Sequence, residues 1–295
     1  MFQTIEFNQI VKDVFGTELH FLIAEDGKEI IGVCAIHEVD DSRLRSSSHS
    51  GPRMFEVPYG GWVLKDRRLE LRLARMIECG DFSCVLYWSL PVLDVESRSQ
   101  WKEEQRFETL VIDLSMSLGD IFSRSVDAKR RNMIRKAERS GVSIIDGNAD
   151  DVEIFYHEMI VENNKKNRIP IHPKKLYVEV FNKFSASGEA KLLLAEKDGE
   201  YLAGVFIVRN ALFAHYWIGA RKIDCDNIGQ GEMLQWHAIQ WAKEQGSRYY
   251  DLCGFEPVRL PLLAEFKADF SKQIVPFYLV QKRGFGYRIV YRLGL

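Results

Sequence analysis

One β-hairpin pattern occurs twice in the chain, and this repeat limits the folds that the sequence can adopt. In each copy, two β-rich runs flank a short turn segment that contains Asp-Gly, a strong hairpin signal. The first copy has the runs Leu19 to Ala24 and Glu29 to Val39, and the second has the runs Leu192 to Ala195 and Tyr201 to Val208. Ala-Glu precedes the turn and Gly-Val follows it in both copies. We therefore expect one supersecondary unit to be present twice.

The length of the chain agrees with two domains. A single hydrophobic core stops growing well before 295 residues, and 46% hydrophobic residues supply enough side chains for two cores. Helical and β-rich patterns alternate around each hairpin, which predicts an α/β fold with a mixed sheet flanked by helices in each domain. Gly141 ends a basic helical segment. We expect domains at 1–141 and 142–295, with the last residues packing back on the first domain.

Charge and cysteine usage exclude several classes of protein. The formal net charge of −2 gives no overall field toward DNA or an anionic membrane. The N-terminus lacks a signal-peptide pattern, and no apolar run is long enough to span a bilayer, so we expect a cytoplasmic protein with no transmembrane segment. The five cysteines are scattered, no CxxC pair is present, and no histidines stand at metal-ligand spacing. We expect no metal.

Two segments carry features suited to anions. Gly229 and Gly231 open a helix, where free backbone N–H groups can receive a phosphate. Their spacing is similar to the end of the pyrophosphate loop of acetyl-CoA-dependent N-acetyltransferases, although Asp226 stands where that loop has Gln or Arg; an ordinary glycine-rich turn is the alternative. The basic segment "DAKRRNMIRKAERSGV" is either a solvated helix face or a docking surface for a phosphate-rich substrate.

Four motifs in this order resemble the FemAB family. They are "RRNMIRKAERSGV", "AHYWIGA", "LQWHAIQWAKEQGSRYYDLCGF" and "LAEFKADF", and the resemblance extends from about Tyr59 to Val280. The FemAB family consists of two-domain relatives of GNAT acyltransferases and includes the enzymes of the peptidoglycan interpeptide bridge. The resemblance implies two tandem GNAT-like domains and an N-acyltransferase.

The resemblance also implies roles for individual residues. The Phe-Lys pair of the family falls on Phe266 and Lys267, and the lysine would stabilise negative charge at the reacting carbonyl. The ligand-facing tyrosine falls on Tyr216, and an arginine that contacts substrate phosphate falls on Arg168. No long charged helical hairpin of the kind thought to bind tRNA is present. The acyl donor is therefore left open between aminoacyl-tRNA and acyl-CoA.

Acyl transfer to an amine also requires a proton acceptor and an aligned pair of substrates. Asp251, which ends a predicted strand, and Glu256 are the candidates for proton transfer or substrate contact, and His215 is a weaker one. Asp251 has an alternative role as the cap of the turn at Cys253 and Gly254. The helix around Lys267 is expected to bury an apolar stripe consisting of Leu262, Leu263 and Phe270.

The expected function is transfer of an aminoacyl or acyl group to an amine of a cell-envelope acceptor. The acceptor would be a peptidoglycan precursor or polysaccharide, either a small molecule or linked to a lipid or nucleotide, and no cofactor would be tightly bound. One alternative is an acyl-CoA-dependent N-acetyltransferase that acts on a small molecule or amino sugar. Another is a non-catalytic protein that binds a nucleotide-linked ligand.

Overall fold

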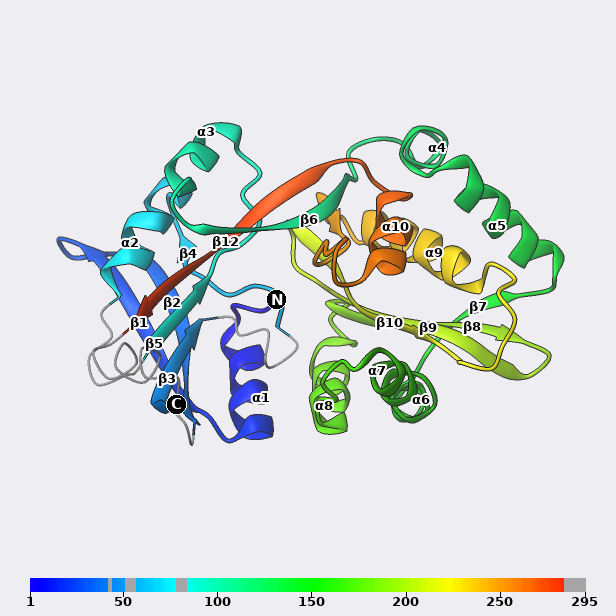
Figure 1. Ribbon diagram of the computed structural model, residues 1–295, viewed down its shortest axis with the longest axis horizontal. Helices are drawn as coiled ribbons and strands as arrows, with labels where there is room; N and C mark the ends of the chain where they lie inside the picture. Colours follow the sequence, from blue (N-terminus) through cyan, green and yellow to red (C-terminus); the bar gives the residue numbers. More distant parts are fainter. Residues whose placement is uncertain (42–43, 51–56, 78–83, 284–295) are drawn as a thin grey trace. The chain divides into compact units, whose positions relative to one another are not determined.

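A computed structural model describes residues 1–41, 44–50, 57–77 and 84–283 (Figure 1). The chain divides into two compact units. The central unit comprises Met1 and Thr109–Ile274, and the flanking unit comprises Phe2–Glu108 and Val275–Leu295. The boundary between the units therefore lies between Glu108 and Thr109 and not at Gly141. The reason is that side chains such as Leu110 and Ala137 are buried in the same core as residues that follow Gly141.

The flanking unit contains a mixed sheet with the strand order β1-β2-β3-β5-β12. Its strands are β1 (Glu18–Asp26), β2 (Glu29–Asp41), β3 (Leu44–Ser50), β4 (Val63–Leu64), β5 (Cys84–Trp88) and β12 (Ile274–Arg283). The β3–β5 pair is parallel, and β4 pairs with β2 beside this order. The helical segments are α1 (Ile5–Phe15), η2 (Arg67–Leu69), α2 (Glu70–Met76), α3 (Val95–Arg98) and η3 (Ser99–Trp101).

The central unit contains a second mixed sheet, with the strand order β6-β11-β10-β9-β8-β7. Its strands are β6 (Gln105–Asp113), β7 (Ser143–Asp146), β8 (Ala190–Lys197), β9 (Glu200–Arg209), β10 (Phe213–Arg221) and β11 (Tyr249–Asp251). Only the β10–β11 pair is parallel among the pairings described here, and it ends where His215 lies opposite Asp251. Because β10 continues to Arg221, the two strands part beyond this point and leave one side of β10 unpaired.

Helices cover both faces of the central sheet. The helical segments are α4 (Leu118–Asp120), η4 (Ile121–Ser125), α5 (Ala128–Arg139), α6 (Ala149–Phe155), η5 (Tyr156–Ile160), α7 (Val161–Asn167), α8 (Lys174–Phe184), α9 (Gln230–Glu244) and α10 (Pro261–Ala268). Figure 1 shows α5 and α9 on one face and α6, α7 and α8 on the other. The apolar stripe of α9, which includes Leu234, Ala238 and Ile239, accounts for its position against the sheet.

The two predicted hairpins are confirmed, and they share a structural detail. Both turns contain two residues, and Gly27 in the first and Asp198 and Gly199 in the second adopt positive φ angles, as tight hairpins require. In both hairpins the register shifts directly after the alanine of the Ala-Glu pair, between Ala24 and Glu25 and between Ala195 and Glu196. The repeat in sequence is therefore a repeat of a hairpin with the same bulge. The predicted α/β fold class is also confirmed.

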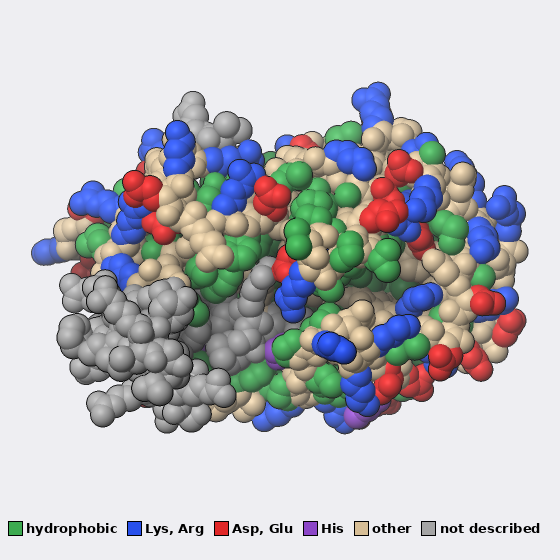
Figure 2. Space-filling view, in the orientation of Figure 1, with side chains coloured by type: hydrophobic (Ala, Val, Ile, Leu, Met, Phe, Trp, Pro, Cys, Tyr) green, Lys and Arg blue, Asp and Glu red, His purple; other side chains and the backbone are tan. Residues whose placement is uncertain are grey.

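The predicted apolar stripe of α10 was wrong in part. Phe270 is fully buried, but Leu262 is 82% exposed and Leu263 lies at the surface. The helix begins at Pro261, so these two leucines lie in its first turn, and neither is buried. Apolar side chains are visible at the surface in this region in Figure 2. Among the described residues, no helix is both long and apolar enough to cross a bilayer.

Candidate active site

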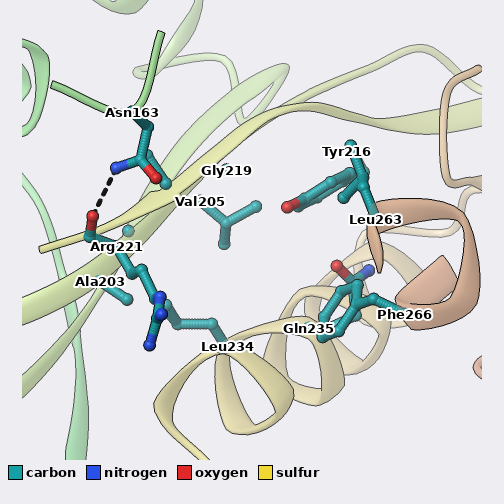
Figure 3. A pocket seen from close by; sticks show the side chains of 13 residues that line it. Asn163, Ala203, Val205, Tyr216, Gly219, Arg221, Leu234, Gln235, Leu263 and Phe266 are labelled. Atoms are coloured by element: carbon teal, nitrogen blue, oxygen red, sulfur yellow. Dashed lines mark hydrogen bonds between the residues drawn. The ribbon is translucent and has the colours of Figure 1, made fainter. Parts of the chain in front are cut away.

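A pocket of about 200 Å³ lies in the central unit. Its walls come from β9, β10, α9 and α10, and Figure 3 shows the side chains that line it. Most of the lining is small or apolar, with Ala203, Val205, Leu234, Leu263 and Phe266 among its residues. The pocket adjoins β10 beyond the point where this strand parts from β11. A gap of this kind allows a ligand to approach the backbone and side chains of β10.

Tyr216 lines this pocket, as the resemblance implied. A β-bulge follows Tyr216 in β10, and the next side chain, Trp217, packs on the opposite face against Tyr177 and Phe206. Burial raises the pKa of Tyr216 well above its usual value, so its hydroxyl stays protonated at neutral pH. None of the described residues forms a hydrogen bond with this hydroxyl, which faces the cavity in Figure 3.

Phe266 and Lys267 occupy different positions on α10. Phe266 lines the pocket, whereas Lys267 is 6% exposed and does not belong to the lining. The Lys267 ammonium group donates hydrogen bonds to the carbonyl oxygens of Cys253 and Gly254, the latter at 2.9 Å. It also lies 5.7 Å from the centre of the Tyr216 ring. The structure therefore brings the predicted Phe266, Lys267 and Tyr216 together in one place.

Asp251 is fully buried and is surrounded by hydrogen-bond donors. Its oxygens accept from the hydroxyl of Thr109 at 2.5 Å, from Nδ1 of His215 at 2.9 Å and from the backbone N–H of Cys253 at 3.0 Å. Burial acts to raise the pKa of Asp251, but these hydrogen bonds outweigh it and lower the pKa. Burial lowers the pKa of His215, so its neutral ring donates to an ionised Asp251. The turn-capping contact expected as the alternative role of Asp251 is present.

Gly229 and Gly231 have different surroundings. Gly229 is the N-cap of α9 with a φ of 98°, and a side chain at this position would collide with the backbone oxygen of Met133 in α5. Gly229 therefore permits close packing of α5 against α9 and does not line the pocket. Gly231 does line the pocket and has open space beside its Cα. A ligand in the pocket can approach the first turn of α9 at Gly231.

Two predicted substrate contacts lie outside the pocket lining. Arg168 is exposed at the C-terminal cap of α7 and adopts a left-handed conformation with a φ of 54°. Glu256 is partly buried in the loop before α10 and forms an ion pair with Arg259 at 3.4 Å. Neither residue belongs to the set that lines the pocket. Their roles in binding an acceptor remain predictions.

Two arginines of the basic segment are occupied by contacts within the protein. Arg130 is buried and forms ion pairs with Glu232 of α9 at 2.8 Å and with Asp269 after α10 at 3.0 Å. Arg131 donates hydrogen bonds to three backbone carbonyls in the segment before α5. On the face shown in Figure 2, basic and acidic side chains are interspersed. These contacts give Arg130 and Arg131 a structural role. The other basic side chains of α5 are exposed, so the phosphate-docking surface considered from the sequence stays a prediction.

Two groups of described residues hold possible metal ligands close together. His215, Asp251 and Cys253 each place one such atom within 4.8 Å of the others, and so do the more exposed Glu18, His20 and Glu38. In the first group the Asp251 carboxylate accepts hydrogen bonds from Thr109, from Nδ1 of His215, and from both the backbone N–H and the thiol of Cys253. No step proposed below requires an ion.

Sequence reasoning missed three polar residues that line the pocket, namely Asn163, Arg221 and Gln235. Asn163 donates a hydrogen bond to the carbonyl oxygen of Arg221 at 2.5 Å, which joins α7 to the end of β10 (Figure 3). Gln235 is 1% exposed and lies on the buried side of α9. A polar residue within the apolar stripe of a helix was the signal that could have identified Gln235.

Comparisons with known proteins identify a domain and a fold. Residues 124–266 match the model of the acetyltransferase (GNAT) domain, and a search of curated protein sequences finds no match. The crystal structure of FemX is similar, with a TM-score of 0.73 and 11% identity, over 99% of this chain and 94% of that one. L-PGS from Bacillus licheniformis is also similar, with a TM-score of 0.52 and 14% identity, over 98% of this chain and 95% of that one.

A third similar structure is a C-terminal domain described as that of a lysylphosphatidylglycerol synthetase, from Agrobacterium fabrum. The TM-score is 0.57 with 14% identity, over 99% of this chain and 91% of that one. The GNAT match includes every residue that lines the pocket. The chain is therefore an acyltransferase that contains a GNAT domain and has a FemAB-like fold.

Proposed function

We propose that the protein transfers an acyl or aminoacyl group from an activated donor to an amine of a cell-envelope precursor. The amine attacks the donor carbonyl, an amide bond forms, the bond to the donor carrier breaks, and the proton lost by the amine passes to the leaving group or to solvent. The support for an envelope acceptor is the FemAB-like sequence motifs and the fold shared with FemX and with the lysylphosphatidylglycerol synthetase domain.

One observation carries the proposal, namely the pocket beside the open edge of β10 with the Tyr216 hydroxyl in its wall. An apolar pocket with few polar groups suits the acyl part of a donor. The protonated Tyr216 hydroxyl is placed to donate a hydrogen bond to the donor carbonyl, where negative charge develops during attack. Lys267 supports this role because its charge lies beside the Tyr216 ring and it fixes the turn at Cys253 and Gly254.

Asp251 serves in this proposal as a positioning residue. Its hydrogen bonds join β6, β10 and the turn after β11, so it fixes the place where β10 and β11 part. An Asp251→Asn variant keeps the size of the side chain but cannot accept from all of these donors. We expect it to lower the melting temperature and kcat together, whereas Glu256→Gln, which replaces a partly buried carboxylate in the loop before α10, should leave the melting temperature unchanged.

A transfer assay tests the proposed function. The protein is incubated with acetyl-CoA or with a mixture of aminoacyl-tRNAs, and with a UDP-linked muramyl pentapeptide as the acceptor. Mass spectrometry should detect an acceptor whose mass has increased by one acyl or aminoacyl group, and Tyr216→Phe should reduce its rate of formation. A protein that binds the acceptor but produces no modified acceptor with any donor would contradict the proposal and favour a binding protein.

The GNAT match favours a second candidate, an acyl-CoA-dependent N-acetyltransferase that acts on a small amine or amino sugar. Gly231, which lies in the first turn of α9 and lines the pocket, is where the diphosphate of CoA would approach the helix. Protection from thermal unfolding by CoA, without protection by aminoacyl-tRNA, would support this second candidate.

A further inference from the structure

Gln235 has an unsatisfied polar atom in the wall of the pocket. Its side-chain nitrogen donates a hydrogen bond to the hydroxyl of Tyr250 at 2.7 Å. Its carboxamide oxygen is buried and has no hydrogen-bond partner among the described residues. Figure 3 shows the carboxamide facing the cavity. A buried carbonyl oxygen without a donor is costly, and in native proteins such atoms are uncommon.

A second glutamine shows that burial on α9 does not by itself leave a carboxamide oxygen without a hydrogen-bond donor. Gln230 lies in the first turn of the same helix and is equally buried. Its oxygen accepts from the backbone N–H of Ile228 at 2.9 Å, and its nitrogen donates to the carbonyl of Asp226 at 2.9 Å. Both polar atoms of the Gln230 side chain thus have hydrogen-bond partners within the protein. The carboxamide oxygen of Gln235 has no such partner among the described residues. The difference points to a ligand that supplies the missing donor.

Two polar atoms in the wall of the pocket have complementary character. The Tyr216 hydroxyl is a donor, and the Gln235 oxygen is an acceptor. The rest of the lining is mostly apolar and would exclude groups that need several hydrogen bonds. A ligand that carries a carbonyl oxygen and an N–H group on a short apolar segment satisfies both atoms, and an acyl chain that lacks an N–H satisfies only Tyr216.

We propose that Gln235 is a specificity-determining residue, which accepts a hydrogen bond from an N–H group of the acyl donor. This inference rests on the proposed function, because it assigns the pocket to the donor. The N–H group has two possible sources. It is either the amino group of an aminoacyl donor, next to the reacting carbonyl, or an amide of the pantetheine arm of CoA.

Binding measurements on the whole chain distinguish the sources. The probes are CoA, 3′-alanylamino-3′-deoxyadenosine and the matching 3′-propionylamino compound, which lacks the amino group. The variant is Gln235→Met with Tyr250→Phe, so that neither partner of their hydrogen bond is left unsatisfied. The control is Tyr250→Phe alone, which keeps Gln235. Thermal melts confirm that both variants are folded.

If the amino group is the source, the parent protein and the control should bind the alanyl probe about tenfold more tightly than the propionyl probe, as expected for one hydrogen bond. The double variant should bind both probes equally. If the pantetheine arm is the source, the double variant should lose about tenfold in CoA affinity relative to the control, and the two adenosine probes should not differ. Replacing Gln235 by Glu instead of Met keeps an acceptor oxygen. In either case, this replacement should retain the affinity that is lost with Gln235→Met.

Equal affinities of the control and the double variant for all three probes would overturn the inference, and so would a parent protein that binds none of them. The binding measurements and the transfer assay together distinguish failure of this inference from failure of the proposed function. If the transfer assay detects product while Gln235 makes no difference to binding, the proposed function stands and the inference fails. If the probes bind with the expected preference but no product forms, the inference stands for a binding protein and the proposed function fails.

Discussion

Lys267 depends on an unusual backbone turn for its position. Cys253 has a φ of 49° and Gly254 a φ of 60°, and two successive residues of this kind direct both carbonyl oxygens toward the same ammonium group. A left-handed conformation is unfavourable for a cysteine, so the contacts of the turn must stabilise it. Asp251 accepts from the N–H of Cys253, and Lys267 donates to the two carbonyls. The charge of Lys267 and the shape of the turn thus depend on each other.

Lys267→Met removes the charge and keeps most of the side-chain volume. Two carbonyl oxygens lose their donor, so we expect the free energy of unfolding to fall by about 1–3 kcal/mol. If the charge also stabilises the transition state through Tyr216, kcat should fall about 100-fold. Chemical denaturation and the transfer assay measure the two effects. Lys272→Met is the control, because Lys272 is an exposed lysine just beyond the same helix, and it should change neither quantity.

The His215–Asp251 pair predicts the direction of the pH dependence of stability. Burial places the pKa of His215 below its ordinary value of 6.5, so the unfolded chain binds a proton more readily than the folded protein does. The free energy of unfolding should therefore decrease as the pH falls below about 6.5. The lowered pKa of Asp251 adds a further loss in more acidic solution, below its ordinary value of 3.8.

His215→Asn tests this assignment, since the asparagine amide can still donate to Asp251 but does not titrate. Melting temperatures measured between pH 8 and pH 5 should decrease less steeply for the variant than for the parent protein. An unchanged slope would show that other groups, such as His237, whose pKa is also lowered by burial, determine the dependence in this range.

At the scale of elements, the pocket depends on how α5, α9 and α10 are fixed to one another. Arg130 of α5 pairs with Glu232 of α9 and with Asp269 just after α10, and the Arg130 guanidinium lies 5.0 Å from the centre of the Phe266 ring. Two helices that contribute to the pocket are therefore held by a third that does not line it. This arrangement explains why one arginine of a strongly basic helix is buried.

Gly229→Ala should disturb the contact between α5 and α9. The added methyl group would collide with the backbone oxygen of Met133, and the φ of 98° is unfavourable for alanine. Because backbone cannot move as easily as a side chain, we expect a loss of at least about 2 kcal/mol in the free energy of unfolding. Urea denaturation monitored by circular dichroism measures this loss.

Gly231→Ala is the matched control for Gly229→Ala. Nothing lies within 4 Å of the new methyl group, and alanine is favoured over glycine within a helix, so stability should be unchanged or higher by about 0.5–1 kcal/mol. Because Gly231 lines the pocket, the same methyl group should weaken donor binding. The opposite result, with Gly231→Ala destabilising and Gly229→Ala neutral, would contradict the packing described here.

The sequence allowed the elements to be predicted better than the contacts between them. The hairpin at Asp198 and Gly199 follows from local turn chemistry and alternating side chains, and it was predicted correctly. The pairing of His215 with Asp251 depends on a parallel alignment of β10 with β11. In the sequence, α9 separates these two strands, and no local pattern specifies their register. The exposure of Leu262 likewise depends on where the core lies, which helical periodicity alone cannot show.

At the scale of the whole molecule, the division into units has a consequence for fragments of the chain. The core of the central unit includes Leu110, Ile112 and Ile121, which precede the expected boundary at Gly141. Thr109 of β6 also donates a hydrogen bond to Asp251, and β6 pairs with β11. A fragment that begins at residue 142 lacks β6 and α5, and it leaves one edge of β11 and the buried face of α9 without their partners.

A fragment comprising residues 109–274 should therefore fold, whereas a fragment comprising residues 142–295 should not. The first keeps the core of the central unit and every residue that lines the pocket. We expect it to unfold cooperatively on heating and to retain donor binding, because the pocket is built from this unit alone. The second should show no cooperative transition in circular dichroism, since the buried Glu232 loses Arg130 and the core loses the side chains of β6 and α5. Cooperative unfolding of the 142–295 fragment would show instead that the boundary inferred from Gly141 separates two stable domains.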